Sequence, residues 1–292
     1  MKLGIIGGGS VGLLLGGFLA KNHQVTVYVK RGGQKQLLNK HGIWLVNATE
    51  PVPVRSLLLD EMRNEECFIV CVKQPHISRV IPAINKTNMN TPVIFLQNGM
   101  EHIKLLEKVS QPAIVGVVEH GAIRKNDYSV AHRGRGNIKL AVFKGERSTL
   151  DSIERQLHQP DFPIESFHDW ELLLHEKLIV NAVINPISAL FDITNGGILK
   201  NVHIQKLARE ICCEVSFVLN LDFNEQWNRV QTIAEQTGNN VSSMLKDIRE
   251  NNETEIEAIC GYLIKRSKQP IPYTSFIYQS IKALEEKKEK IK

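Results

Sequence analysis

The chain has 292 residues, enough for one large or two ordinary domains, and its hydrophobic content of 42% supports a sizeable core. Its net charge of +5 comes from 36 basic residues interleaved with 31 acidic ones, and no basic block alternates with aromatic residues, so we expect no nucleic-acid partner. No window reaches the ~18 apolar residues of a membrane span, and no cleavage site follows the N-terminal apolar stretch, so we expect neither a membrane span nor a targeting segment.

The first 31 residues predict a strand–turn–helix–strand unit. Lys2–Ile6 is an apolar run suited to a buried strand, Val11–Ala20 has the composition of a helix, and Val25–Val29 is a β-branched strand. Glycine is concentrated between the first strand and the helix. That arrangement is the local context in which a glycine-rich turn binds a dinucleotide.

The glycines in this turn have the G-x-G-x-x-G spacing of a dinucleotide fingerprint. Gly7 permits the tight turn, Gly9 lets the backbone approach a pyrophosphate, and Gly12 lets the helix pack closely on the strand. The pyrophosphate would bind the N–H groups at the helix N-terminus. The alternative, a plain βα turn, fits the flanking strands and helix less well. The cofactor-binding residues expected here are Gly7, Gly8, Gly9, Ser10, Val11 and Gly12.

The end of the second predicted strand favours NADP(H) over NAD(H). An NAD site usually has an acid there, which binds the ribose hydroxyls, yet no acid occurs between Val25 and Gly33. Arg31 follows the strand instead and could bind a 2′-phosphate through two hydrogen bonds. The alternative is that Lys30 and Arg31 simply end a surface strand.

Alternating strands and helices continue to about residue 160. The expected strands are Gly42–Val46 and Val52–Leu58, which form a hairpin, then Cys67–Val72, Pro92–Leu96, Ala113–Val118, Ser129–Gly136 and Asn137–Phe143. The expected helices are Pro75–Ile84, Glu101–Val109 and Thr149–His158. This alternation predicts a doubly wound α/β sheet.

From Trp170 onwards the sequence shows helical periodicity and no convincing strand, with Asp169 as the N-cap of the first helix. Further helices are expected at Val202–Leu221, Glu225–Gln236, Met244–Arg249, Thr254–Lys265 and Ser275–Lys287. The predicted fold is therefore an N-terminal Rossmann-type domain, residues 1–168, followed by an all-helical C-terminal domain, residues 169–292.

One predicted helix of this second part carries a polar stripe. Lys177, Asn181 and Asn185 recur every four residues, so they lie on one face of a helix, and the residues between them are apolar. A buried lysine needs a partner, and a substrate carboxylate or carbonyl would supply one. The alternative is an exposed polar stripe, although asparagine is a poor helix former.

Two other polar segments have simpler explanations. Ser242 or Ser243 precedes an apolar pair and is explained fully as a helix N-cap. Glu255 is not distinguished by sequence physics from an ordinary solvated glutamate. The five cysteines show neither C-x-x-C nor zinc spacing and lie in apolar runs, which predicts reduced, buried thiols, a cytoplasmic location and no metal site. They are Cys67, Cys71, Cys212, Cys213 and Cys260.

Over nearly its whole length the chain resembles the ketopantoate reductases (2-dehydropantoate 2-reductases). The segments that carry the resemblance are Gly7–Gly12, Val72-Lys73, Gln97-Asn98-Gly99, Glu119-His120-Gly121-Ala122, Lys177-x3-Asn181-x3-Asn185-Pro186, Thr194-Asn195-Gly196, Ser242-Ser243-Met244-Leu245 and Thr254-Glu255-Ile256. The order and spacing of the second-domain segments are more specific than the glycine loop. The chain departs from the family pattern at Lys246, Glu253, Glu257 and Cys260.

The resemblance implies a role for each matched residue. Lys73, Asn98 and Ala122 would bind NADP(H) together with the glycine loop and Arg31. Lys177 would be the catalytic acid, and Glu255 would act where cofactor and substrate meet. The residues expected to bind substrate are Asn98, Lys177, Asn181, Asn185, Asn195 and Ser243.

The implied reaction is the NADPH-dependent reduction of 2-dehydropantoate to pantoate, a step of pantothenate and coenzyme A biosynthesis. Two alternatives stay open. The chain could be a related reductase of another 2-keto or 3-hydroxy acid, or an NADP-sensing regulatory protein without catalysis, which would have no use for the lysine–asparagine stripe. The partner is a small 2-keto acid, and the helical domain could supply a homodimer interface.

Overall fold

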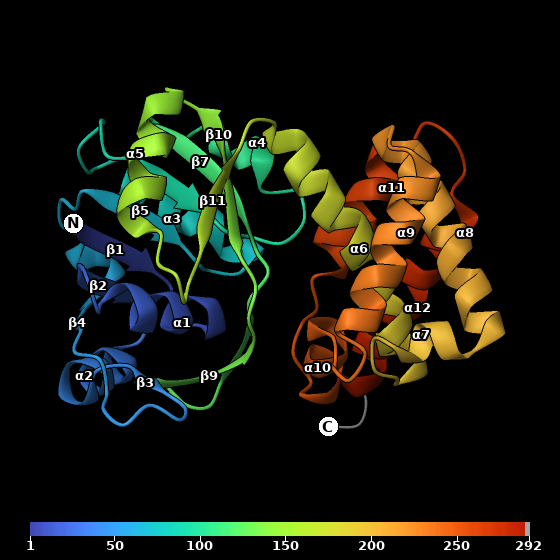
Figure 1. Cartoon of the computed structure of the whole chain (residues 1–292), viewed down its shortest axis with the longest axis horizontal. Coiled ribbons are helices and arrows are strands. Elements are labelled where there is room, and N and C mark those ends of the chain that lie inside the picture. The colour runs from blue at the N-terminus through green and yellow to red at the C-terminus, as the bar shows by residue number, and fades with distance from the viewer. Residues whose placement is uncertain (290–292) are drawn as a thin grey trace. The chain divides into compact units, whose positions relative to one another are not determined.

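The computed structural model describes residues 1–289, so residues 290–292 of the expected second domain lie outside the described part. The chain divides into two compact units. Unit 1 comprises Met1–Gln97 and His102–Leu173, and unit 2 comprises Asn98–Glu101 and the chain from Leu174 onwards. Figure 1 draws unit 1 mostly in blue and green and unit 2 mostly in yellow to red.

The main sheet of unit 1 has eight strands in the order β11-β10-β7-β6-β5-β1-β2-β4. Neighbouring strands run parallel except β10 and β7, which are antiparallel. The run β4-β2-β1-β5-β6-β7 is the doubly wound order of dinucleotide-binding folds, so the predicted fold class is confirmed. The bounds are β1 Lys2–Ile6, β2 Gln24–Val29, β4 Arg55–Leu58, β5 Cys67–Val70, β6 Val93–Phe95, β7 Ala113–Val118, β10 Ile138–Lys144 and β11 Ile164–Phe167.

The strand order puts β1 at the point where the sheet changes direction. β1 pairs with β2 on one side and with β5 on the other. All four residues of β5 are buried, as are Leu3 and Ile5 of β1. A strand covered on both faces reads as a continuous apolar run, which is why these strands were predictable. In open α/β sheets ligands bind at this switch point, beyond the carboxyl ends of the strands.

Helix α1, Ser10–Leu19, packs against two sheets. It contacts β1 and β2 of the main sheet and also a three-stranded sheet of order β3-β9-β8. The small sheet comprises β3 Trp44–Leu45, β8 Gly121–Arg124 and β9 Ser129–Gly134. Every residue of α1 from Gly12 to Leu19 is buried. A helix between two sheets must be apolar on all sides, which accounts for its sequence SVGLLLGGFL.

The predicted hairpin between Gly42 and Leu58 is wrong. Only the bridge between Ile43 and Val52 joins its two halves. Trp44–Leu45 pairs in parallel with β9, whereas Arg55–Leu58 pairs in parallel with β2. The apolar pattern identified extended segments correctly, but it carries no information about a partner strand that is distant in the sequence.

Four elements of unit 1 were not predicted from the sequence, one of them the short 3₁₀ helix Leu59–Glu61. Helix α2, Gly32–His41, begins with two glycines and buries only Gln34 and Leu38, so its periodic signal is weak. Strands β8 and β11 have four residues each, most of them half-buried, which leaves no clear alternation. The remaining helical segments of this unit are η1 Leu59–Glu61, η2 Gln74–His76, α3 Ile77–Ile84, α4 Ile103–Leu106 and α5 Arg147–Leu157.

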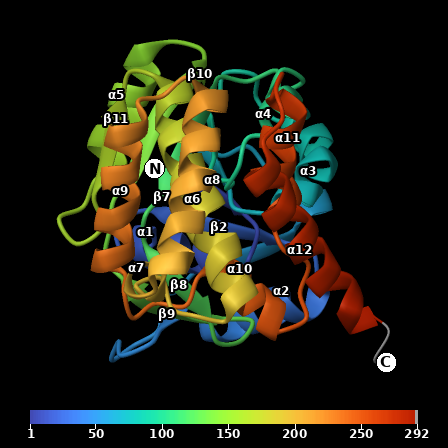
Figure 2. The same cartoon turned by 90° about the vertical axis from the view of Figure 1, so that its right-hand side faces the viewer.

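In the described part of unit 2, the chain from Leu174 onwards forms helices and no strand, as predicted (Figure 2). α8 packs against α7, α9 and α12. The elements are α6 Trp170–Phe191, which begins at the end of unit 1, then α7 Gly197–Lys200, α8 Val202–Leu219, α9 Phe223–Gln236, α10 Ser243–Arg249, the π-turn η3 Glu257–Gly261, α11 Tyr262–Arg266 and α12 Pro272–Glu289.

Side-chain caps fix where these helices begin. Asp169 Oδ1 accepts hydrogen bonds from the N–H groups of Glu171 and Leu172, at 2.9 and 3.0 Å, so the predicted cap of α6 is confirmed. Asn201 and Asp222 cap α8 and α9 in the same way. The helix predicted at Thr254–Lys265 is wrong in its first part, because the chain there is a turn that leads into the π-turn and then α11.

The five cysteines are free thiols. Burial raises the pKa of Cys67, Cys71 and Cys260 to about 12, which suppresses the reactive thiolate. Cys213 is exposed, so the prediction of uniformly buried thiols is wrong at that position. Between Met1 and Glu289 no helix combines the length and the apolar character needed to cross a membrane.

Candidate active site

The glycine loop follows β1 directly. Gly7 has φ +114°, a value that favours glycine, and its N–H donates to the carbonyl of Tyr28 at 2.9 Å. A Cβ on Gly12 would lie 1.8 Å from the Gly7 carbonyl oxygen, so only glycine permits α1 to start this close to the strand. The three glycines thus occupy the positions that the fingerprint requires.

The start of α1 fits a pyrophosphate. A Cβ built on Gly9 meets no atom within 4 Å, so the backbone borders open space there. Gly9 is the N-cap, and its carbonyl accepts the first helical hydrogen bond from Leu13. Helix N-termini attract anions because their first N–H groups lack partners inside the helix. Val11 follows in the first turn, and the Ser10 hydroxyl accepts a hydrogen bond from the Arg124 N–H at 3.2 Å.

Arg31 lies beyond β2, as the N-cap of α2. Its guanidinium is paired with Asp127 at 2.5 Å, and Arg124 donates to the same carboxylate oxygen. The sequence itself has no acid near the end of this strand. The structure supplies one from 96 residues further along the chain, in the turn between β8 and β9.

Two other predicted cofactor residues lie in unit 1. Lys73 is the N-cap of η2, two residues after the half-buried Cys71 that follows β5. Ala122 is half-buried in β8, where it pairs with His132 of β9. The structure therefore places the loop, Arg31, Lys73 and Ala122 in one unit. Asn98 belongs to unit 2.

Lys177, Asn181 and Asn185 all lie in α6, and the predicted helix is confirmed. Asn181 is only 7% exposed, whereas Lys177 and Asn185 are half-buried. Leu178 and Ile179 are almost completely buried. A partly buried ammonium beside two carboxamides is suited to bind an oxygen-rich anion or a carbonyl.

Glu255 and Asn98 contact each other in unit 2. The Asn98 amide Nδ2 donates to Glu255 Oε2 at 2.9 Å. Gly99 has φ +76°, and a Cβ there would lie 2.5 Å from the Ala258 carbonyl oxygen. The N–H of Met100 donates to that same carbonyl at 3.4 Å. The segment Asn98–Glu101 is therefore fastened to the π-turn that follows Glu255.

Glu255 sits in a turn that α12 anchors. The N–H of Thr254 donates to Glu285 Oε1 at 2.8 Å, and the Thr254 hydroxyl accepts from the Ile256 N–H at 3.2 Å. Burial alone would raise the pKa of Glu285, but hydrogen bonds from Lys282 and Thr254 outweigh it and lower that pKa. Glu285 thus stays ionised and holds the Thr254 backbone.

The remaining predicted substrate residues, Asn195 and Ser243, also lie in unit 2. Asn195 is 9% exposed; its Nδ2 donates to the Thr237 hydroxyl at 2.9 Å, and its buried Oδ1 has no hydrogen-bond partner within the described residues. Ser242 is the cap of α10 and accepts from the Ser188 hydroxyl at 2.6 Å. Ser243 follows it and is exposed. The cap explanation therefore holds for Ser242 and leaves the Ser243 side chain available.

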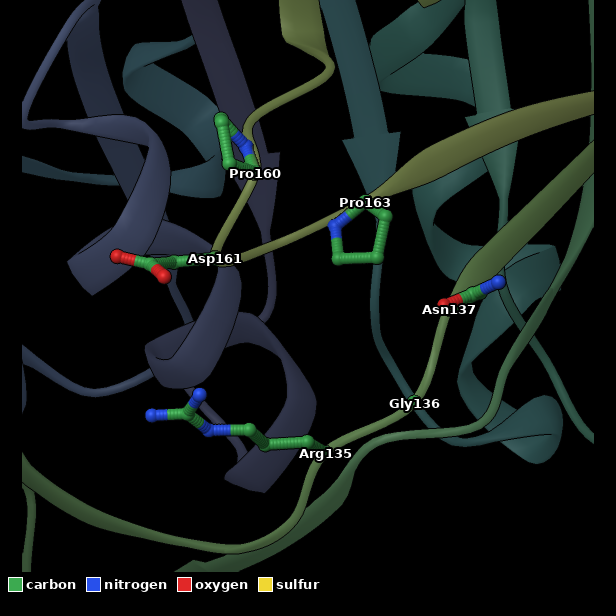
Figure 3. Close-up of a pocket in the computed structure, with 6 residues that line it drawn as sticks. All are labelled: Arg135, Gly136, Asn137, Pro160, Asp161 and Pro163. Carbon is green, nitrogen blue, oxygen red and sulfur yellow. The ribbon is translucent and has the colours of Figure 1, made fainter.

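A surface hollow of about 230 Å³ lies elsewhere in unit 1 (Figure 3). It is lined by Arg135, Gly136, Asn137, Pro160, Asp161 and Pro163. None of the predicted site residues lines it. Among residues 1–289, no three His, Cys, Asp or Glu side chains gather as a metal site would require.

Strand order and glycine loop together define unit 1 as a Rossmann-type dinucleotide-binding fold. The family model described as ketopantoate reductase PanE/ApbA matches residues 3–145, and the model of the C-terminal domain of that family matches residues 169–285. A 2-dehydropantoate 2-reductase of Bacillus subtilis is 39% identical over 298 residues, which cover 100% of both chains. The chain therefore belongs to the ketopantoate reductase family of oxidoreductases, and the resemblance seen in the sequence is confirmed.

Other relatives agree with this assignment. A 2-dehydropantoate 2-reductase of Listeria innocua is 32% identical over 98% of this chain and 97% of its own. The crystal structure of a probable 2-dehydropantoate 2-reductase from Bacillus subtilis has a TM-score of 0.88 at 37% identity, covering 97% of this chain and 100% of its own. The ternary structure of D-mandelate dehydrogenase with NADH and anilino(oxo)acetate has a TM-score of 0.91 at 21% identity, covering 98% and 99%, and so shares the fold.

Proposed function

We propose that this chain reduces 2-dehydropantoate to pantoate with NADPH, with Lys177 as the general acid. The observation that carries the proposal is the stripe of Lys177, Asn181 and Asn185 on one helix, in a chain similar over its whole length to named 2-dehydropantoate 2-reductases. An NADP-sensing protein without catalysis would have no need of this stripe.

The proposal gives each unit a task. Unit 1 binds the nucleotide, with the pyrophosphate at the start of α1 and the 2′-phosphate on Arg31. Lys73 and Ala122 of unit 1 also bind the nucleotide. The family resemblance assigns Asn98 and Glu255 of unit 2 to cofactor binding as well. The substrate binds Asn181, Asn185, Asn195 and Ser243 together with Asn98 and Lys177.

The nicotinamide of bound NADPH supplies the hydride. The chain's own residues stabilise the charge on the keto oxygen and protonate that oxygen. Negative charge develops on the keto oxygen as the reaction proceeds, and the Lys177 ammonium stabilises that charge and then donates the proton. Asn181 and Asn185 donate hydrogen bonds to the substrate without competing for protons. Glu255 accepts a hydrogen bond from Asn98 and is the second catalytic residue of the proposal.

The proposal is tested by the decrease in NADPH absorbance after addition of 2-dehydropantoate. NADH and a panel of other 2-keto acids serve as controls for cofactor and substrate choice. Turnover of another keto acid in preference to 2-dehydropantoate would identify a related reductase, and NADPH binding without any turnover would identify a regulatory protein.

Lys177→Ala tests the general acid. We expect kcat to fall by about 100-fold or more, the usual contribution of a positioned acid, while NADPH binding is retained. Lys206→Ala, which removes an exposed lysine of α8, is the matched control and keeps wild-type turnover. A Lys177→Ala enzyme with wild-type kcat would contradict the mechanism.

The homodimer and the cytoplasmic location stay predictions. A ketopantoate reductase of the same fold from Staphylococcus aureus is described as dimeric.

A further inference from the structure

Asp127 brings a carboxylate to Arg31, which follows β2 in a stretch where the sequence itself has no acid. Its carboxylate accepts from Arg31 at 2.5 Å and also from Arg124. Two guanidinium groups therefore share one carboxylate beside the nucleotide loop. Because Asp127 already pairs with Arg31 and Arg124, it affects how strongly these two arginines can bind an anion.

The turn that carries Asp127 is fastened to the nucleotide loop. Gln34, only 5% exposed, donates from Nε2 to the Gly8 carbonyl at 2.8 Å and to the Asp127 carbonyl at 2.9 Å. The Arg124 N–H donates to the Ser10 hydroxyl at 3.2 Å. Residues of α2, α1 and the β8–β9 turn are thus joined around the glycine loop.

The outer side of the turn is held as well. The N–H of Trp44 donates to the Tyr128 carbonyl at 2.8 Å, and the Tyr128 ring stacks on His41 at 4.8 Å between centroids. Asn126 Oδ1 accepts from the Tyr128 N–H, which closes the turn itself. Asp127 therefore cannot leave the site through a simple displacement of the backbone.

Asp127 has opposite effects on the two nucleotides. A carboxylate at the end of the second strand accepts a hydrogen bond from the 2′-hydroxyl of NADH. The same carboxylate repels a 2′-phosphate and occupies the guanidinium donors that would bind it. Its side chain is 21% exposed and that of Arg31 is 57% exposed, so both are open to a ligand.

We propose that Asp127 is a specificity residue that limits the preference for NADPH over NADH, because a 2′-phosphate must break the Arg31–Asp127–Arg124 pairing in order to bind. The inference rests on the proposed nucleotide-dependent reduction and adds to it. It assigns Arg124 as the second guanidinium that the 2′-phosphate engages.

Asp127→Asn is the direct test, because it removes the charge and keeps the shape. We expect the ratio of kcat/KM for NADPH to that for NADH to rise about tenfold or more. Asp151→Asn, which breaks another arginine–aspartate pair of unit 1 on α5, is the matched control and leaves the ratio unchanged. An unchanged or lower ratio in Asp127→Asn would overturn the inference, since a carboxylate that only orients the arginines would lower it.

Binding of nucleotide fragments tests the role of Asp127 independently of the proposed reaction, because it requires no keto acid. In calorimetry, Asp127→Asn should bind 2′,5′-ADP more tightly than the wild type does, with no gain for 5′-AMP. Arg124→Gln keeps the acid and removes one cation, so it should bind 2′,5′-ADP more weakly. Equal 2′,5′-ADP affinity in all three proteins would overturn the inference. A wild type that binds both probes but reduces no keto acid would contradict the proposed function alone.

Discussion

Gly12 and Gly9 are two residues of one loop with opposite surroundings. Any side chain on Gly12 collides with the Gly7 carbonyl, whereas a Cβ on Gly9 meets no protein atom. Gly9 also has φ −83°, a value that any residue adopts. Gly12 is therefore required by the packing of α1 on the loop, whereas no contact within the protein requires glycine at position 9.

Alanine at these two positions separates folding from binding. Gly12→Ala should lower the melting temperature by several degrees and weaken NADPH binding, since α1 must move away from the loop. Gly9→Ala should melt within about 1 °C of the wild type but bind NADPH at least about tenfold more weakly, because the methyl group fills space meant for the pyrophosphate. Unaltered NADPH affinity in Gly9→Ala, measured by fluorescence titration, would place the pyrophosphate elsewhere.

Asp127 shows at the residue scale what the sequence could not reveal. The inference of an NADP preference used the absence of an acid between Val25 and Gly33, which is correct as a statement about sequence. An acid 96 positions away pairs with Arg31 all the same, because the turn between β8 and β9, strands of a separate sheet, carries Asp127 to it. Asn126 and Asp127 are residue types that favour a turn, so the turn itself was predictable. The local sequence did not indicate where in the fold that turn would lie.

Helix α12 holds the turn that contains Glu255 in addition to packing against its neighbouring helices. The Glu285 carboxylate, near the end of α12, accepts a hydrogen bond from the Thr254 N–H. The Thr254 hydroxyl in turn accepts one from the Ile256 N–H. Glu255 lies between these two residues. The helix thereby fixes the backbone on either side of a proposed active-site carboxylate.

Glu285→Ala should loosen this turn. We expect kcat/KM for the keto acid to fall about tenfold, mostly through kcat, while the affinity of 2′,5′-ADP for unit 1 is retained. Glu285→Gln keeps an oxygen for the Thr254 N–H and should restore most of the activity. If Glu285→Ala and Glu285→Gln lose activity equally, the charge rather than the hydrogen bond is what matters.

The strands of the main sheet were predictable from residues such as those of CFIV in β5, because a strand covered on both faces is apolar throughout. Long helices such as α6 were predictable from their period. The pairing of elements with distant partners was not predictable. Trp44–Leu45 lies in a segment predicted as a strand, but its true partner, Ser129–Val130, could not be identified from the sequence. The Asn98–Glu255 hydrogen bond likewise joins residues 157 apart, and only resemblance had singled out both.

Across the whole molecule, buried histidines make stability depend on pH. Burial lowers the pKa of His102 to about 4, and burial together with His132 lowers that of His120 to about 4, while Glu119 opposes the second shift. An unfolded histidine titrates near 6.5. Between these values the unfolded chain binds more protons than the native chain does, so the free energy of unfolding decreases as the pH falls.

The expected result is a urea midpoint that is constant above about pH 7 and decreases steadily from about pH 6.5 towards pH 4. His102→Leu should flatten this decrease, because it removes a group that titrates. The substitution breaks no hydrogen bond within the described residues, since neither ring nitrogen of His102 has a partner there. His203→Gln, at an exposed position of α8, is the control and should follow the wild type. A decrease in His102→Leu as steep as in the wild type would assign the acid sensitivity to other groups.

The π-turn Glu257–Gly261 makes this stretch intolerant of changes in chain length. A π-turn contains one residue more than the corresponding α-helical turn, and each helical residue adds about 100° of rotation. Deletion of a single residue here would leave a regular helix that continues into α11, and it would turn Glu255 away from Asn98. We therefore expect insertions and deletions to be tolerated in the surface loops of this protein but selected against within Glu257–Gly261.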